Sequence, residues 1–265
     1  MNGITRAGRT VRHLDVVALA AVLLAVLGAA HAQESPNMNM TPSTTGSQSA
    51  AETLTLRQRA IVPIAAFAAA GDIARLGTAL NQGLDARLSI SDAREILVQL
   101  YAYAGFPRSL NALGELMKVV EARKQQGLRD APGNDPGAPI PQGDALLAAG
   151  TANQTRLSGA PVKGPLFDFA PAIDQYLKAH LFGDIFERDN LDWQSRELAT
   201  VGMLSSLAGA EPQLQAHMRI SMNVGLTTAQ LREVAQVLRE HVGPENGRRA
   251  HEALERHLAA DRGGK

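Results

Sequence analysis

Apolar residues recur at helical spacing along most of the chain. Between residues 196 and 227 they mark two successive helical faces, which are separated by a turn at Gly209 and Pro212. The first face carries Leu198, Val201, Leu204 and Ala208, and the second begins with Leu214, Met218 and Met222. This pattern predicts two helices joined by a tight turn, with His217 in the second helix.

The same periodicity predicts helices over most of the remaining chain. Further helices are expected over 56–70, 73–81, 89–104, 109–123, 167–186 with a break at Gly183, 227–242 and 248–258. Ser89 is expected to cap the start of a helix that has Asp92 in its first turn, and Thr227 with Gln230 forms a capping pattern. Together these elements predict an all-α fold.

An internal repeat is visible in the sequence. Gly71 corresponds to Gly209 and Leu88 to Leu226, and the segment 94–96 corresponds to 232–234, always with the same separation along the chain. One helical unit of this size buries only a small core, so we expect two tandem units that pack on each other as an internal pseudo-dimer. The expected organisation is a signal peptide at 1–32, a flexible tether at 33–51, a first unit at 52–127, a Pro/Gly-rich linker at 128–163 and a second unit at 164–262.

The start of the chain has the form of a secretory signal peptide. Three arginines precede an apolar run over 16–30, and the small-x-small sequence Ala30-His31-Ala32 follows. The run is shorter than the roughly 20 residues that span a bilayer. We therefore expect a periplasmic or secreted protein without a membrane segment after cleavage, and a retained anchor is the alternative.

The composition excludes several kinds of chemistry. The chain has no cysteine, which excludes disulfides, thiol nucleophiles and dithiol redox reactions. Its formal net charge is zero, which gives no electrostatic reason to expect nucleic acid or an anionic membrane as a partner. The histidines and carboxylates do not follow the spacing of a metal motif, so no metal is expected.

Two stretches resemble the carboxymuconolactone decarboxylase family, also described as AhpD-like. They are RELATVGMLSSLAGAEPQLQAHMRISMNVGLTTAQLREV at 196–234 and YAYAGFPRSLNALGE at 101–115. The resemblance implies an all-α fold, a homo-oligomer such as a trimer, and a small carboxylated substrate. The peroxidase branch of the family carries a Cys-x-x-Cys pair where this chain has a turn at 209–212, so peroxidase activity is not expected.

The decarboxylase branch carries a histidine where this chain has His217, and it uses no cofactor. The resemblance implies that His217 is the acid–base residue, that Glu197 orients it, and that Arg196 or Arg219 binds the substrate carboxylate. Loss of carbon dioxide leaves negative charge on a lactone, and an imidazole near neutral pH can stabilise that charge and donate a proton. The expected activity is decarboxylation of a small carboxylated lactone, or a related proton transfer.

The two halves of the repeat differ at this position. The counterpart of His217 is Ala79, whereas the first half keeps an aromatic segment with Tyr103, Phe106 and Asn111. We therefore predict one composite site in which His217 faces these residues, with His180 near its entrance. Two alternatives remain: His217 is a hydrogen-bonded core residue, and the protein is a non-catalytic binding or assembly module on the same scaffold.

Overall fold

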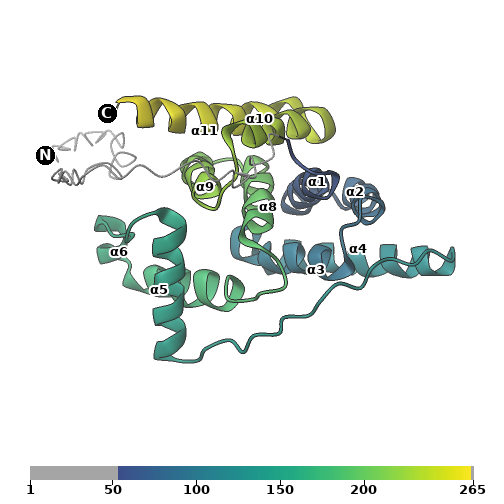
Figure 1. Ribbon diagram of the computed structural model, residues 1–265, viewed down its shortest axis with the longest axis horizontal. Coiled ribbons are helices and arrows are strands. Elements are labelled where there is room, and N and C mark those ends of the chain that lie inside the picture. Colours follow the sequence, from purple (N-terminus) through teal and green to yellow (C-terminus); the bar gives the residue numbers. More distant parts are fainter. Residues whose placement is uncertain (1–52, 264–265) are drawn as a thin grey trace, which may run out of the picture. The chain divides into compact units, whose positions relative to one another are not determined.

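The computed structural model describes residues 53–263, which form helices and their connections without a strand in that range (Figure 1). The predicted all-α fold is confirmed. The elements are, in chain order, α1 (Leu56–Ala70), α2 (Ile73–Asp85), α3 (Ile90–Gln99), α4 (Tyr101–Gln125), α5 (Asp144–Ser158), α6 (Pro165–Phe169), α7 (Pro171–Tyr176), the π-helical segment η1 (Leu177–Ile185), α8 (Trp193–Ser205), α9 (Glu211–Asn223), α10 (Thr228–Val237), the π-helical segment η2 (Leu238–Val242) and α11 (Pro244–Gly263).

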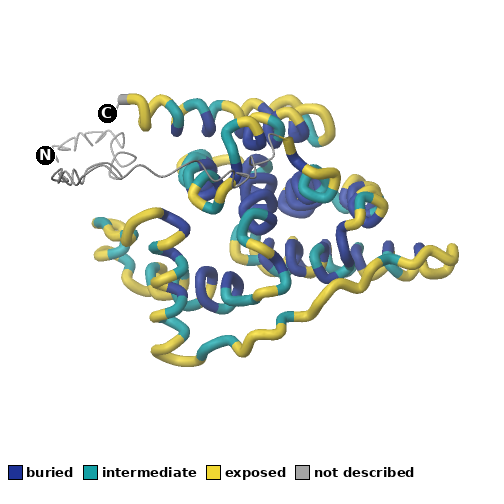
Figure 2. Tube along the Cα trace, in the orientation of Figure 1, coloured by how far each residue is buried: buried dark blue, intermediate teal, exposed yellow. Residues whose placement is uncertain are grey.

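Helices α1 and α8 lie side by side at the centre of the described residues and are buried over most of their length (Figures 1 and 2). Small residues allow this close contact. A Cβ atom added at Gly202 of α8 would lie 2.7 Å from the carbonyl oxygen of Val62 in α1. The two backbones therefore touch directly, and α2, α3, α4, α9, α10, η2 and α11 pack around this pair. The segment from α5 to η1 packs mainly on itself, and its separate hydrophobic cluster contains Leu157, Phe182, Ile185 and Phe186.

Local sequence signals set the starts of several helices as expected. Ser89 and Thr227 each accept a hydrogen bond from the backbone three residues ahead, where the side chains of Asp92 and Gln230 bond back to the cap. The predicted cap at Ser89 and the predicted capping pattern of Thr227 and Gln230 are confirmed, and Ser89 with Asp92 forms a capping box as well. Asp192 begins α8 by accepting a hydrogen bond from the Ser195 backbone at 2.8 Å.

The separation of 138 residues between the matched sequence positions, from Gly71 to Gly209, recurs in the helix boundaries. Helices α2 and α9 both have 13 residues and start at positions 73 and 211, and α3 and α10 both have 10 residues and start at 90 and 228. The equivalent carboxylates Glu95 and Glu233 both bond across to the other half of the chain. Glu95 binds Arg196 at 3.0 Å, and Glu233 accepts the Leu54 backbone N–H at 2.7 Å.

The segment predicted as a linker contains α5, which packs against η1. The prediction missed this helix because its glycines were interpreted as helix breakers. Gly150 lies directly on the carbonyl oxygen of Lys178, and a Cβ added at Gly183 would lie 2.8 Å from the Leu146 side chain. The expected break at Gly183 is also wrong, because this residue lies inside η1. Both glycines allow close packing of two helices.

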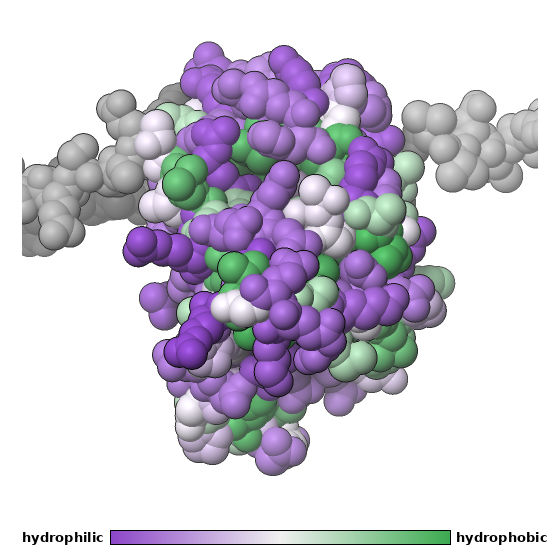
Figure 3. Space-filling view, turned by 90° about the vertical axis from the view of Figure 1, so that its right-hand side faces the viewer, coloured by the Kyte–Doolittle hydropathy of each residue, from purple (hydrophilic) through white to green (hydrophobic). Residues whose placement is uncertain are grey.

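The predicted signal peptide and tether lie outside the described residues. Within residues 53–263, every helix is too short or too polar to cross a membrane. The face drawn in Figure 3 is mainly hydrophilic, and its hydrophobic side chains form separate small groups.

Candidate functional site

A buried histidine–carboxylate pair joins the two central helices of the second half. Glu197 lies one turn into α8, and His217 lies in the middle of α9. The Nδ1 atom of His217 is 2.7 Å from Oε2 of Glu197. The Glu197 side chain has no exposed surface, and the His217 side chain is 10% exposed. A hydrogen bond from Nδ1–H to the carboxylate leaves Nε2 of His217 available for proton transfer.

Tyr103, from the first half of the chain, packs edge-on against His217, with a distance of 5.8 Å between the ring centroids. Its hydroxyl is buried without a hydrogen-bond partner among the described residues. Burial raises the pKa of Tyr103 far above its ordinary value, and the negative charge of Glu197 raises it further. The hydroxyl therefore stays protonated and can act only as a neutral donor or acceptor.

A kink at Gly105 shapes the aromatic segment that contains Tyr103. Gly105 has φ 81° and ψ 161°, which separates the first turn of α4 from the rest of the helix. Tyr101 stacks on Phe106 across the kink at 4.5 Å, and it contacts His180 of η1 at 5.2 Å between ring centroids. His180 is also bonded to Asp184 at 2.6 Å. The predicted residues Phe106 and His180 thus meet at Tyr101.

Arg196 does not occupy the position expected of a substrate-binding residue. It is fully buried, and its guanidinium binds Glu95 at 3.0 Å, the Arg188 carbonyl oxygen at 2.9 Å and the Gln99 side chain at 3.2 Å. These partners lie in α3 and before α8, and they hold the side chain inside the protein. The structure therefore gives Arg196 a structural role in place of the predicted carboxylate contact.

The buried carboxylate of Glu95 forms ion pairs with two arginines. Arg188 makes two hydrogen bonds to it, at 2.7 and 2.9 Å, in addition to the contact with Arg196. Burial by itself raises the pKa of Glu95, but the bonds to Arg188 and Arg196 outweigh burial and hold this pKa below its ordinary value. Sequence reasoning missed this cluster, although Glu95 belongs to one of the matched repeat segments.

No hydrogen bond or ion pair among the described residues joins Arg219 or Asn111 to Glu197 or His217, and Nε of Arg219 is buried without a partner among them. Arg219 is two residues after His217 in α9, and residues with this spacing point to different sides of a helix. Asn111 is exposed on α4. In contrast, Ser221 lies one turn after His217, and its hydroxyl is buried without a partner among the described residues. Ser221 is therefore a site residue that the sequence analysis overlooked.

The described part of the chain has no group of three or more histidine, aspartate or glutamate side chains placed to hold a metal ion. The Glu197–His217 pair is instead suited to acid–base chemistry, for which a hydrogen-bonded imidazole and carboxylate suffice.

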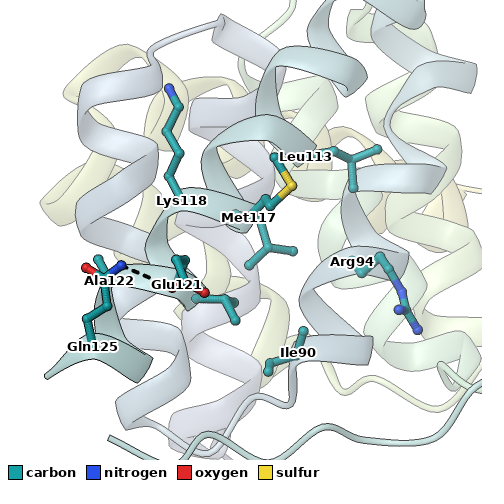
Figure 4. A pocket seen from close by; sticks show the side chains of 10 residues that line it. Ile90, Arg94, Leu113, Met117, Lys118, Glu121, Ala122 and Gln125 are labelled. Atoms are coloured by element: carbon teal, nitrogen blue, oxygen red, sulfur yellow. Dashed lines mark hydrogen bonds between the residues drawn. The ribbon is translucent and has the colours of Figure 1, made fainter. Parts of the chain in front are cut away.

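Three surface cavities, of about 750, 380 and 330 Å³, are lined by residues other than His217. The largest lies between α3 and α4. Figure 4 shows Ile90, Leu113 and Met117 around it, with Gln125 bonded to Glu121 at one side. Its wall is mainly apolar and offers no acid–base pair.

Residues 171–256 match the model of the carboxymuconolactone decarboxylase family. The matched segment begins at α7, ends within α11 and contains Glu197 and His217. Tyr103 lies outside it. No curated protein matches the chain. The match thus supports a relation to this family through the second half of the chain.

Proposed function

We propose that the protein catalyses cofactor-free decarboxylation, or a related proton transfer, on a small carboxylated lactone. The observation that carries this proposal is the buried bond of 2.7 Å between His217 and Glu197, next to the ring of Tyr103. The family match over 171–256 includes both members of the pair. A carboxylate that holds one ring nitrogen of a histidine prepares the other for acid–base catalysis.

In the proposed reaction, the bond between the substrate carbon and its carboxylate breaks and releases carbon dioxide. The electron pair moves into the conjugated lactone, where the protonated Tyr103 hydroxyl donates a hydrogen bond to the oxygen that becomes negative. The carbon then takes a proton from Nε2 of the His217 imidazolium, and solvent returns this proton. Glu197 stabilises the imidazolium while it exists.

Arg196 has a different place in this mechanism from the one implied by the family resemblance. Because Arg196 binds Glu95, it does not neutralise the reacting carboxylate. A carboxylate surrounded by apolar groups loses carbon dioxide more readily, because the departing product is neutral. We propose that the ring of Tyr103, which packs against His217, supplies part of these surroundings.

We also propose that the chain contains two copies of one helical unit, packed as an internal pair with one composite site. The equal lengths of α2 and α9 and the reciprocal contacts of Glu95 and Glu233 support this organisation. The first copy supplies Tyr103, and the second supplies Glu197 and His217. We also propose that the protein is exported to the periplasm or the medium, because the sequence predicts a signal peptide at 1–32.

The test is turnover by the purified protein. The protein is incubated with γ-carboxymuconolactone, and carbon dioxide and the decarboxylated lactone are measured against a protein-free control. We expect release of the two products in equal amounts. If protein with a cooperative melting transition releases no carbon dioxide above the control, the result supports the alternative of a non-catalytic module with the same scaffold.

We further propose that the chain self-associates through one side of α4. Phe106, Leu110 and Met117 are 63%, 62% and 71% exposed on that helix. The equivalent positions of α11 are Pro244, Arg248 and Glu255. Arg248 and Glu255 show that charged side chains are compatible with these positions in α11. Packing within the chain therefore does not explain the apolar side chains on α4, and we propose that a second copy of the chain covers them.

Light scattering after size-exclusion chromatography tests this association. The wild type is expected to have the mass of an oligomer, and the variant with Leu110→Glu and Met117→Glu the mass of a monomer, since two buried charges disfavour the interface. Arg248→Glu on α11 is the matched control and should remain an oligomer. A monomeric wild type, or a double variant with unchanged mass, would contradict the proposal.

A further inference from the structure

The cavity of about 380 Å³ lies where α5, α8 and α9 meet, apart from the Glu197–His217 pair. It is lined by Arg156, Asp192, Trp193, Gln194, Asn223 and Val224. Its volume falls in the range of small-molecule sites. Its wall combines one cation, one anion, two amides and two apolar groups.

The cation of this cavity is Arg156 of α5. Its guanidinium carbon lies 4.7 Å above the centroid of the Trp193 ring. Among the described residues no carboxylate lies within ion-pair distance of it. Stacking on the indole holds the plane of the guanidinium and leaves its N–H groups available. A guanidinium held in this way is suited to bind a carboxylate through two parallel hydrogen bonds.

The side-chain amides of Gln194 and Asn223 present their oxygen atoms as hydrogen-bond acceptors. Asn223 donates its amide N–H to the Leu157 carbonyl oxygen at 2.8 Å, and Gln194 donates to the Val224 carbonyl oxygen at 3.0 Å. These bonds use an N–H group of each amide and leave both side-chain oxygens as acceptors. They also tie α5 to α9 and α9 to α8, so the wall is fixed before a ligand arrives.

The anion of the cavity is Asp192, whose side chain is 61% exposed. Its nearest cation is Arg57 at 3.9 Å, which binds Asp92 more closely at 3.0 Å. Asp192 and Arg156 line the same cavity, yet they form no ion pair with each other. The cavity thus keeps a positive and a negative group apart, with acceptors beside the negative one.

We propose that this cavity binds a small α-amino acid. The ligand carboxylate binds the guanidinium of Arg156, and the ligand ammonium binds Asp192 and the side-chain oxygens of Gln194 and Asn223. A side chain of the size of leucine then packs on Trp193 and Val224. A ligand that has a carboxylate but no amino group offers no hydrogen-bond donor to Asp192 and the amide oxygens. A ligand that has an amino group but no carboxylate offers no acceptor to Arg156.

The equivalent place in the first half shows that the fold does not dictate these residues. A cavity of about 330 Å³ lies there, and its wall has Leu56, Asp85 and Ala86 at the positions of Gln194, Asn223 and Val224. Thr55 takes the position of Trp193. The first-half cavity therefore lacks the aromatic ring and the two amides at these positions, although its wall also contains Arg59, Gln82 and Asp85. The repeat thus does not dictate the residues around Trp193.

Trp193 is the only tryptophan of the chain, so its fluorescence reports directly on this cavity. The full protein is titrated with L-leucine, with 4-methylpentanoate, which lacks the ammonium group, and with 3-methylbutylamine, which lacks the carboxylate. Calorimetry provides a second readout. We expect saturable binding of leucine and at least about tenfold weaker binding of the two partial ligands, since each loses a charged contact.

Variants separate a binding site from a structural contact. Arg156→Gln is expected to weaken leucine binding by at least about tenfold in calorimetry. Asp192→Asn, which keeps the helix cap, should weaken leucine binding but leave 4-methylpentanoate unchanged. Arg248→Gln, a surface change on α11, is the control, and melting curves verify that each variant is folded. The proposal is overturned if 4-methylpentanoate binds as tightly as leucine, if folded Arg156→Gln binds leucine like the wild type, or if no saturation occurs up to about 10 mM leucine.

Discussion

Replacement of His217 by alanine is expected to reduce kcat for decarboxylation by about 10²- to 10⁴-fold, the usual contribution of a general acid or base. The reason is the position of the imidazole, which is held by Glu197 at 2.7 Å and has its second ring nitrogen free for proton transfer. The measurement is the initial rate of carbon dioxide release at saturating substrate. KM should change less than kcat, because proton donation acts in the transition state.

Two further variants sharpen this result. His251→Ala, an exposed histidine of α11, is the matched control and should retain the wild-type rate. Glu197→Gln removes the charge that stabilises the imidazolium and should give an intermediate rate. Equal rates for wild type and folded His217→Ala would remove this residue from the mechanism and leave it the role of a hydrogen-bonded core residue.

Replacement of Glu95 by alanine is expected to lower the free energy of unfolding by about 3–5 kcal/mol, because removing one partner of a buried ion pair leaves the other charge uncompensated. Here the substitution removes the carboxylate that binds Arg196, which is fully buried, and it also removes the ion pair with Arg188. The measurement is urea denaturation monitored by circular dichroism at neutral pH.

The control for this experiment is Glu245→Ala. Glu245 forms an ion pair with Arg248 on the surface of α11, where both side chains are about half exposed. Exposed pairs contribute roughly 0–1 kcal/mol, so this variant should remain close to the wild type. If Glu95→Ala were no less stable than Glu245→Ala, the buried cluster would not stabilise the fold in the way the geometry indicates.

The contribution of Glu95 also has a defined dependence on pH. Its pKa is lower in the folded protein than the ordinary value of 4.5 that applies to the unfolded chain. A lowered pKa stabilises the folded state fully above the unfolded value, and this stabilisation is lost as the pH falls through the folded pKa. The difference in stability between wild type and Glu95→Ala should therefore be largest near neutral pH and shrink below about pH 4.5.

Local features of the sequence predicted the helices well. The capping boxes at Ser89 and Thr227 and the end of α1 at Gly71 depend on residues within a few positions, and the structure contains all three. The same local view failed at Gly150 and Gly183. A glycine can end a helix, or it can lie inside a helix where another helix packs closely against it. Only the tertiary structure shows which of the two applies.

The sequence by itself determined the helical fold, because periodicity and caps can be recognised in the order of the residues alone, and the internal repeat and the role of His217 stay predictions. Only the tertiary structure decided what the charged residues do. Arg196 and Glu197 are adjacent in the chain, yet Arg196 turns to Glu95 while Glu197 turns to His217. These partners lie on other helices, so they meet only in the folded chain, and burial makes an unpaired charge too costly for either residue to remain free.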